Sequence, residues 1–365
     1  MSSDWHFGVY PLQLNKWLNN QLEYFHKEMI PYLKSNVEEG DIFIMLGDLF
    51  DSRTSVPILV HNKVEDLLVE ISKILPLHII VGNHDLWNRK DTTVNSPKSF
   101  NWIPNVNIYN NTHTIDYNGK KLVLMPWVEK KVDMISEIKT NPGDYLFCHS
   151  DLNGCRMHLS SVAHRNPDKI EVDSFSGYNR VFSGHIHIRQ VQKNFEFIGA
   201  PYQMDRNDYG DKKGMTILYP ETGETKFIKN TISPEFKKFT VENDGDLLLL
   251  DTLDTSKNFV DLTIKNSTIV GNRKNRKLLE EILHKKKFAS VENINDLAKN
   301  KKQPKLNENL DIDIEDLQFT DFSKTIVDYV DNQEMENTKF KNGVMAELDK
   351  LLNLYEKEYK FKSDS

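Results

Sequence analysis

The sequence predicts an α/β protein with a small second module, and three observations support that prediction. Segments with apolar residues at helical spacing alternate with short strand-like apolar runs, from the start of the chain to about residue 232. Each strand-like run ends on a cluster of polar residues. Beyond residue 232 these clusters stop, and a strand, a helix and a second strand follow. A chain of 365 residues can bury more than one hydrophobic core, so two folded modules fit its length.

The first module is expected to place several strand ends at one edge of a sheet. Helical spacing marks two segments, around residues 14–25 and 64–71. Hairpin turns are expected at 117–120, where Asn-Gly suits a type I′ turn, and at 221–224. The strand-like runs are 42–46, 77–81, 144–148 and 180–184. Because each run leads directly into polar residues, their side chains can converge where loops are free to build a site.

The second module is predicted to be a small α+β unit. Residues 259–265 and 288–294 have the pattern of strands, and the segment between them, 275–287, has the pattern of a helix. The polar stretch after this unit is typical of a linker, and the last part of the chain has two helical stretches. We therefore divide the chain into 1–232, 233–298, the linker 299–312 and the helical tail 313–365.

Composition excludes several classes of protein. Hydrophobic residues make up 38% of the chain and charged residues 28%, and no apolar run reaches the length of a membrane span. The N-terminus lacks the pattern of a signal peptide, and Cys148 and Cys155 are too few for a disulfide framework. We therefore expect a cytoplasmic protein, in the host cytoplasm if it is viral. A net charge of -7 argues against coating nucleic acid with a basic surface, but it leaves room for a local groove.

The polar clusters together predict a metal centre. Taken alone, each has a structural explanation, such as a turn after a strand or a hydrogen-bonded core histidine. As a set they supply carboxylate, imidazole and amide ligands, which suit Mn, Fe or Zn, and the residues leave that choice open. Seven ligands are too many for one ion and fit two ions that share a carboxylate. The clusters contain Asp4 and His6, Asp48 and Asp51, Asn83, His84 and Asp85, His149, and His185 and His187.

The motifs D-x-H, GD-x-x-D, GNHD, H and GHxH, in this order, resemble those of the calcineurin-like metallophosphoesterase superfamily. Within it, SDWHFG, GDLFDSR, VGNHDLW and SGHIHIRQ are most similar to the nuclease subunit of double-strand-break repair nuclease–ATPase complexes, the bacterial SbcCD type and its bacteriophage counterparts. The resemblance covers roughly residues 3–232. It implies a calcineurin-like β-sandwich flanked by helices in four layers, a small α+β capping domain and a C-terminal helical segment.

The resemblance also implies roles for the polar residues. Asp48 would bridge two divalent ions, most commonly Mn²⁺ in this family. His84 would face the phosphate and protonate the leaving oxygen or stabilise the developing charge, and Asp51 would orient a neighbour such as His84. The remaining ligands form two sets, the first ligand set of Asp4, His6 and His187 and the second ligand set of Asn83, His149 and His185.

These residue types suit phosphodiester hydrolysis for physical reasons. A phosphodiester is anionic and repels hydroxide, whereas two cations ~3.5–4 Å apart neutralise its oxygens and align attacking and leaving groups. A shared carboxylate can serve both ions. A neutral amide such as that of Asn83 adds a ligand without adding negative charge against the substrate. A general acid must lie within hydrogen-bond reach of the leaving group, and His84 is next to a ligand in the sequence.

Basic residues beside the motifs are candidate DNA contacts. Arg53, Arg89, Lys90 and Arg189 each follow a motif, and such side chains hold a DNA backbone without reading its sequence. Trp5 is expected in the core. A further basic group has two open interpretations, a DNA contact or a solvated helix face, and it comprises Arg273, Lys274, Arg276, Lys277, Lys285, Lys286 and Lys287.

The tail is the candidate partner-binding segment. An apolar stripe from Val344 to Tyr355 resembles the segment by which this family binds the coiled-coil base of its SMC-like ATPase. Such a stripe can also pack on its own domain. The resemblance further implies a homodimer and a metal-dependent DNA nuclease, 3′–5′ on duplex ends and endonucleolytic on single strands, that acts in DNA repair, recombination or replication. Two rivals stay open: a phosphoesterase acting on nucleotides or phosphoproteins, and a non-catalytic scaffold of the same fold.

The start of the chain raises one further expectation. The family places D-x-H at the end of a buried strand, yet only three residues precede Asp4, and a strand needs about five. A truncated chain or a misassigned start would explain this. We therefore expect Asp4 and His6 to be poorly held and the first ion to bind weakly.

Overall fold

The structure is a computed structural model, and it describes residues 1–10, 14–161, 163, 165–265 and 272–293. All of these residues belong to one compact unit, Met1–Lys299. The predicted linker and the predicted tail helices lie outside the described residues. Among the residues that are described, no helix is both long and apolar enough to cross a bilayer.

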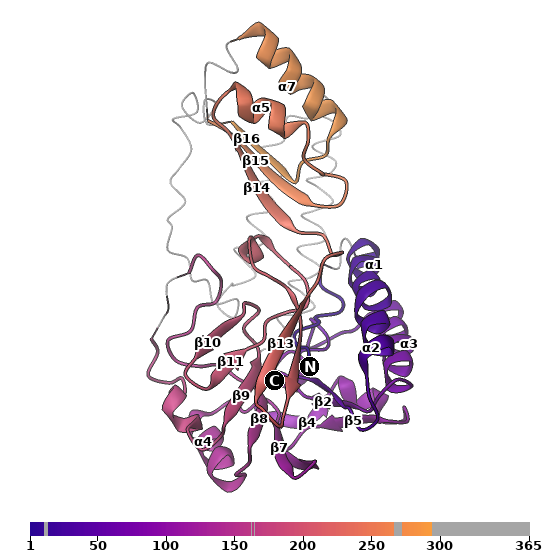
Figure 1. Ribbon diagram of the computed structural model, residues 1–365, viewed down its shortest axis with the longest axis vertical. Coiled ribbons are helices and arrows are strands. Elements are labelled where there is room, and N and C mark those ends of the chain that lie inside the picture. The colour runs from indigo at the N-terminus through magenta and orange to yellow at the C-terminus, as the bar shows by residue number, and fades with distance from the viewer. Residues whose placement is uncertain (11–13, 162, 164, 266–271, 294–365) are drawn as a thin grey trace, which may run out of the picture. The chain divides into compact units, whose positions relative to one another are not determined.

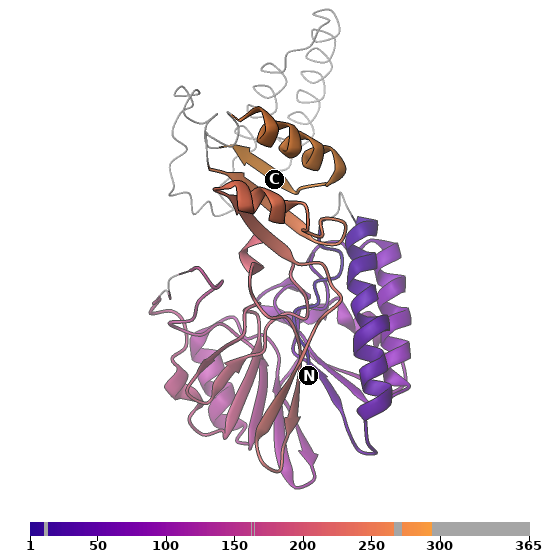
Figure 2. The ribbon, with the colours of Figure 1, turned by 45° about the horizontal axis from the view of Figure 1, so that its top comes forward.

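A small parallel sheet carries helices on one side. Figures 1 and 2 show the three helices side by side beside this sheet. Helix α1 continues through a π-helical turn, Phe25–Met29, into α2. The predicted apolar stripe of α3 is buried, with Val64, Leu67 and Ile71 fully covered. The elements are α1 (Leu14–Tyr24), α2 (Ile30–Asn36), α3 (Ile58–Ser72), β1 (Phe43–Met45), β2 (Leu77–Ile80) and β5 (Val106–Tyr109).

A larger sheet of six strands has the order β10-β11-β9-β8-β7-β6. Figure 1 labels these strands except β6. Its central strands β7, β8 and β9 run parallel. Helix α4 (Lys131–Thr140) packs on it through Met134 and Ile138. On its other face, Leu124 and Phe182 share a core with Ile44 of β1. The strands are β6 (His113–Tyr117), β7 (Lys120–Met125), β8 (Tyr145–His149), β9 (Arg180–Gly184), β10 (Gln190–Gln192) and β11 (Phe195–Phe197).

The predicted hairpins are present in the described chain. Asn118 and Gly119 have φ angles of 52° and 77°, as a type I′ turn between β6 and β7 requires. The second hairpin joins β12 (Gly214–Tyr219) to β13 (Glu224–Lys229). A shorter hairpin, β3 (Leu86–Asn88) with β4 (Asp91–Asn95), follows the GNHD motif. Three short 3₁₀ helices cover Pro97–Phe100, Val172–Phe175 and Arg206–Asp208.

Residues after 232 form a separate parallel sheet, β14-β15-β16. The strand, helix and strand that the sequence predicts are present as β15, α7 and β16, but β14 and α5 precede them and were not predicted. The sheet and its helices enclose an apolar core that includes Val241, Leu262 and Ile282. The elements are β14 (Phe236–Val241), α5 (Asp244–Leu250), β15 (Phe259–Ile264), α7 (Arg273–Lys285) and β16 (Ser290–Asn293).

The segment from Met1 to Phe7 lies along β1, contrary to the expectation that it lacks support. Ser2 N–H donates to the Ile44 carbonyl at 3.1 Å, and Leu46 N–H donates back to Ser2 at 2.9 Å. On the other side, Thr216 N–H of β12 donates to the Met1 carbonyl at 3.0 Å. Parallel bridges at Ser2–Met45 and Phe7–Phe50 extend this pairing. A short bridging segment therefore provides the backbone support that was expected from a full strand.

Candidate metal centre

The strand ends deliver the predicted ligands to one place. Asp48 follows β1, Asn83 follows β2, His149 is the last residue of β8 and His185 directly follows β9. The chain turns sharply at these points, because several ligands have left-handed backbone angles that are uncommon for residues with a side chain. The φ angles are 54° at Asp4, 45° at His6, 57° at Asp48 and 84° at His185.

Glycines beside the ligands allow the backbone segments to approach closely. A Cβ atom on Gly82 would lie 2.2 Å from Asp48 Oδ1. One on Gly184 would lie 2.0 Å from Ser3 Oγ and 2.4 Å from the Leu46 carbonyl oxygen. The glycines of the GD, GN and GH motifs therefore make room for the neighbouring ligand-bearing segments.

The first ligand set comes together as predicted. Ligand atoms of Asp4, His6 and His187 all lie within 4.8 Å of one another. His6 Nε2 and His187 Nε2 face each other at 3.2 Å. Asp4 is fully buried, and its carboxylate accepts the N–H of His185 at 3.0 Å. This contact joins the N-terminal segment to the end of β9.

The second ligand set also converges. His149 Nδ1 donates to the Leu46 carbonyl at 2.7 Å, so Nε2 points inward. Nε2 lies 3.0 Å from Asn83 Oδ1, and His185 Nδ1 lies 2.9 Å from the same oxygen. Ligand atoms of Asp48, His149 and His185 are within 4.8 Å of one another.

Asp48 lies between the two ligand sets. Its Oδ2 is 3.2 Å from His149 Nε2 and 3.6 Å from His6 Nε2. Its Oδ1 instead accepts the backbone N–H of His84 at 2.8 Å. One carboxylate oxygen therefore faces both sets, while the other is engaged by the backbone.

The donor atoms suit bound cations. Nδ1 of His149 carries a proton, so in the neutral ring Nε2 has only a lone pair, and that lone pair faces two oxygen acceptors. Lone pairs that face one another repel, so these acceptor atoms require a cation or an added proton between them. Neighbouring ligands on an ion at ~2.1 Å and at right angles are about 3 Å apart. The nitrogen–oxygen separations of 2.9, 3.0 and 3.2 Å match that spacing.

The pKa values show that the site favours positive charge near Asp48. Burial alone would raise the pKa of Asp48, but the surrounding His149 and His6 lower it well below its ordinary value. Burial disfavours the cationic form of His149, yet Asp48 raises its pKa to about 9. Burial lowers the pKa of His185 to about 3 and that of His187 well below its usual value. Neutral His185 and His187 rings keep lone pairs available for ligation.

His84 and Asp51 are near each other, though not as predicted in detail. His84 Nδ1 donates to the backbone carbonyl of Asp51 at 2.6 Å, so the main chain rather than the carboxylate orients this ring. The Asp51 carboxylate lies 3.3 Å from Nδ1 of His6. The rings of His6 and His84 are 4.9 Å apart between centroids, which places His84 beside the first ligand set. Ligand atoms of His6, Asp51 and His84 also fall within 4.8 Å of one another.

Asp85 organises the site, and the sequence reasoning gave it no role. Its buried carboxylate accepts the backbone N–H groups of Gly82, Asp48, Leu49 and Phe50 at 2.9 to 3.3 Å. It thereby ties the turn after β1 to the turn after β2. Burial, followed by the charge of Asp48, raises the pKa of Asp85 to about 7. The sequence signal that could have identified Asp85 is its position directly after the Asn-His pair of the GNHD motif.

The predicted DNA contacts have different surroundings. Arg53 lies close enough to His84 to help lower the pKa of that ring, after the larger effect of burial. Arg89 and Lys90 line a hollow of about 390 Å³ together with Trp127. The sequence analysis did not identify Trp127 as part of the site. The Trp127 ring lies 5.1 Å from the ring of His185, so the hollow borders the metal centre.

Arg189, the fourth predicted contact, is engaged inside the protein. Its guanidinium donates to Glu196 at 2.7 Å and to Thr216 at 2.6 Å, and it lies over the ring of Phe227. The basic group in and just after α7 is exposed except for the half-buried Lys286, and Arg276 and Lys277 pair with acidic residues four positions along. Trp5 is fully buried, as expected.

Comparisons with known proteins identify the family of the chain. Residues 2–189 match the family model described as calcineurin-like phosphoesterase, so the chain belongs to that family. It is similar to "Exonuclease subunit 1" of Enterobacteria phage T4, with 31% identity over 235 residues, 62% of this chain and 66% of the T4 protein. The chain thus spans just under two thirds of that relative. It is also 24% identical over 249 residues to 244L of Invertebrate iridescent virus 6, a protein named as a phosphoesterase, covering 64% of this chain and 85% of that protein.

Proposed function

We propose that the protein is a two-metal DNA nuclease, a 3′–5′ exonuclease on duplex ends and an endonuclease on single strands. One observation carries the proposal: two ligand sets share the Oδ2 atom of Asp48, with His84 beside them. Family membership supports a phosphoesterase, and the T4 relative is named as an exonuclease subunit. We infer a four-layer arrangement of the catalytic domain from the apolar cores on both faces of its sheets.

The ligand sets would hold two divalent ions, and we propose that both are Mn²⁺. Asp4, His6 and His187 would hold the first, Asn83, His149 and His185 the second, and Asp48 both. When bound, two such ions polarise the phosphodiester and lower the pKa of water from 15.7 toward about 7. The Asn83 amide, buried between two imidazoles, would contribute a ligand without further repulsion of the anionic substrate.

His84 is the proposed general acid, or stabiliser of charge at the leaving oxygen. Because Nδ1 is bound to the Asp51 carbonyl, Nε2 is directed away from that carbonyl and is the atom that can meet substrate. Burial lowers the pKa of His84, with Asp48 opposing this change. A phosphate anion beside the ring would raise that pKa and favour the protonated form needed by a general acid.

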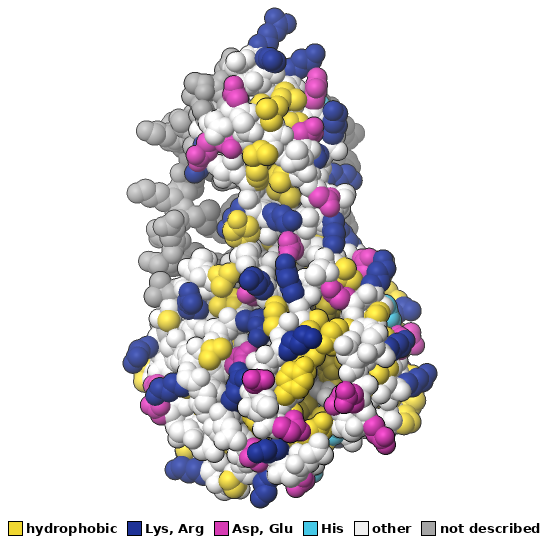
Figure 3. Space-filling view, viewed as in Figure 1, with side chains coloured by type: hydrophobic (Ala, Val, Ile, Leu, Met, Phe, Trp, Pro, Cys, Tyr) yellow, Lys and Arg dark blue, Asp and Glu magenta, His cyan; other side chains and the backbone are white. Residues whose placement is uncertain are grey.

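DNA would approach over Arg53 and the hollow with Arg89 and Lys90. Arg189 is not part of this proposal because its guanidinium is committed to Glu196 and Thr216. On the face in Figure 3, Lys and Arg lie among Asp and Glu. On a face where basic and acidic side chains are mixed, DNA binding through a few phosphate contacts is more consistent than binding to a broad basic surface.

We further propose that the chain works as a homodimer with an SMC-like coiled-coil ATPase, in repair, recombination or replication of DNA in the cytoplasm. The name of the T4 relative, an exonuclease subunit, supports the presence of a partner. Residues 313–365 would bind the ATPase through the apolar positions noted in the sequence.

Replacing His84 by Ala tests the proposed function. We expect the Mn²⁺-dependent rate on linear duplex DNA to fall about 10²–10⁴-fold, because the general acid is lost while all seven ligands remain. Digestion should be measured beside Mn²⁺ binding, which should be unchanged. The matched control is His26→Ala, an exposed histidine paired with Glu70.

The same assay separates the rival functions. Cleavage of a small chromogenic phosphodiester with none of DNA would favour a phosphoesterase acting on nucleotides or phosphoproteins. No cleavage of either substrate by wild type would favour a scaffold. Wild-type rates in His84→Ala would contradict the role of that ring.

A further inference from the structure

Asp151 lies against the second ligand set and belongs to none of the motifs. Its Oδ1 is 3.1 Å from Nε2 of His185, and its other oxygen accepts from Lys169. Nδ1 of the same His185 ring is the atom that faces Asn83. Asp151 therefore contacts the nitrogen on the far side of the ring from the metal centre.

Two other histidines of the site, His149 and His84, follow one pattern. His149 has Nδ1 on the Leu46 carbonyl and Nε2 inward, and His84 has Nδ1 on the Asp51 carbonyl. Each ring thus has an oxygen acceptor that fixes which nitrogen carries the proton. Rings that bind metals generally donate their second N–H to a carboxylate, a carbonyl or water. For His185 the acceptor in that position is Asp151.

We propose that Asp151 is a positioning residue for the second metal, because its carboxylate accepts a hydrogen bond from Nε2–H of His185 and leaves the Nδ1 lone pair facing Asn83 and Asp48. Lys169 keeps the Asp151 carboxylate in place from its other oxygen. The Trp127 ring, 5.1 Å away, limits rotation of the imidazole from its face. The inference rests on the proposed metal centre, and it adds a residue from the loop after β8 to that centre.

The loop itself is built to present both partners. Asn153 N–H donates to the Ile170 carbonyl at 2.8 Å, and its side chain accepts from Asn166 N–H at 2.8 Å. These bonds hold the segment with Lys169 near Asp151. A plain loop-closing ion pair would need only Asp151 and Lys169. Contact with His185 is the additional feature that a purely structural role does not explain.

The test compares metal binding and the protonation of His185. Titration of the full chain with Mn²⁺ should give two sites in wild type. In Asp151→Ala we expect one site to weaken about 10–100-fold and the other to stay unchanged, since loss of such a supporting group has effects of that size. Asp168→Asn, an exposed acidic residue on the same loop, is the matched control and should bind like wild type.

A second readout needs neither metal nor nuclease activity. Long-range ¹H–¹⁵N spectra of the metal-free protein should show His185 with its proton on Nε2, and Asp151→Ala should give a mixture of the two forms. Asp151→Asn retains an oxygen acceptor, so it should restore the single form. If Asp151→Ala does not fold, Asp151→Leu, which has similar bulk and no acceptor, takes its place with the same expected losses.

Two results would overturn the inference: two wild-type Mn²⁺ affinities in the Ala variant, or an unchanged His185 spectrum in that variant. Failure of wild type to bind Mn²⁺ would instead contradict the metal centre, and the spectra would still decide the role of Asp151. A lowered unfolding temperature with both readouts unchanged would assign Asp151 to loop stability alone.

Discussion

At the scale of single residues, the residues that converge on the candidate metal centre were easier to predict than those that support them. Asp48, Asn83 and His149 are recognisable because their residue types occur in a fixed order at strand ends. Asp85 was not assigned because its role is to accept four backbone N–H groups, and no residue pattern announces such contacts. Arg189 was misleading for a similar reason, since its ion pair with Glu196 of β11 depends on how the chain folds back after the GHxH motif.

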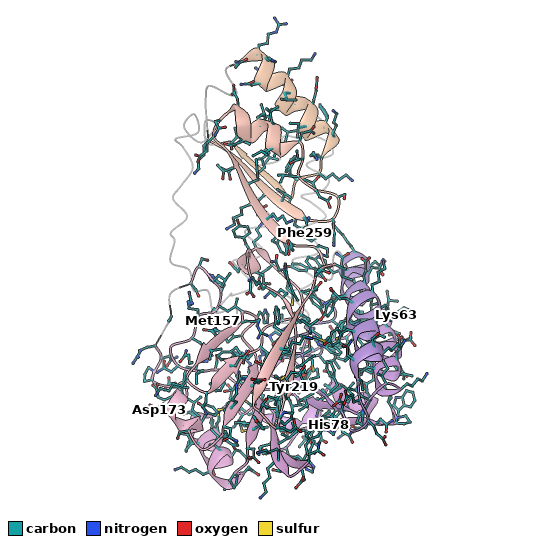
Figure 4. The ribbon with its side chains drawn as sticks, in the orientation of Figure 1. Lys63, His78, Met157, Asp173, Tyr219 and Phe259 are labelled. Atoms are coloured by element: carbon teal, nitrogen blue, oxygen red, sulfur yellow. The ribbon has the colours of Figure 1, made fainter. Side chains whose placement is uncertain are left out.

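His78 gives a residue-scale prediction about pH. It lies on β2 (Figure 4), where burial, and next the charge of His113, lower its pKa from 6.5 to about 4. Between these values the unfolded chain binds a proton that the folded chain does not, so stability falls as the pH drops from 6.5 to 4. We expect a loss of about 2 kcal/mol, once screening by solvent is allowed for.

Urea unfolding with EDTA present, from pH 4.5 to 7.5, measures this effect. His78→Gln should lose less stability on acidification than wild type, whereas His26→Gln, which changes an exposed ring, should follow wild type. Parallel curves for wild type and His78→Gln would show that His78 does not titrate in this way.

At the scale of elements, local pattern predicted the strands but not how they are paired. Short apolar runs were sufficient to predict β8 and β9. The turn residues were sufficient to predict the Asn118-Gly119 hairpin. The pairing of Met1 with Thr216 was not foreseen, because it joins residues 215 positions apart. The expectation of poor support for Asp4 was wrong for that reason. Strand β14 and helix α5 were missed because no motif or clear alternation marks them.

The end of β9 gives an element-scale prediction. Gly184→Ala should lower stability by about 2–3 kcal/mol and weaken metal binding, because the new Cβ meets Ser3 Oγ at 2.0 Å and the Leu46 carbonyl oxygen at 2.4 Å. Gly177→Ala is the control, since nothing lies within 4 Å of its added Cβ. Chemical unfolding and Mn²⁺ titration of both variants provide the measurements. Equal stability of the two variants would mean that the packing around Gly184 yields easily.

At the scale of the whole molecule, the order of the motifs predicted the family and the convergence of the ligands. That order carries information about topology which no single cluster contains. It could not give the backbone angles of Asp4, His6 and His185, or the single oxygen of Asp48 that faces both ligand sets. Those features depend on how segments from distant parts of the chain pack together.

Metal binding should stabilise the whole folded unit. The buried acceptors of Asp4, Asp48 and Asn83 lie beside His6 and His149, and an ion that binds only the folded state shifts the equilibrium toward it. Mn²⁺ at 100 times its dissociation constant should add about 2.7 kcal/mol per site. Thermal unfolding with and without EDTA measures this. His84→Ala should keep the response, and an unchanged midpoint in wild type despite measured binding would contradict it.

The hydrogen bond from His185 N–H to Asp4 joins residues 181 positions apart. During synthesis, Asp4 leaves the ribosome long before its partner has been made. A nascent chain can fold its first helices and strands early, but the complete pocket requires β9 to have emerged. The candidate metal centre is therefore incomplete until about half of the polypeptide has been translated, and an aborted N-terminal fragment would lack part of it.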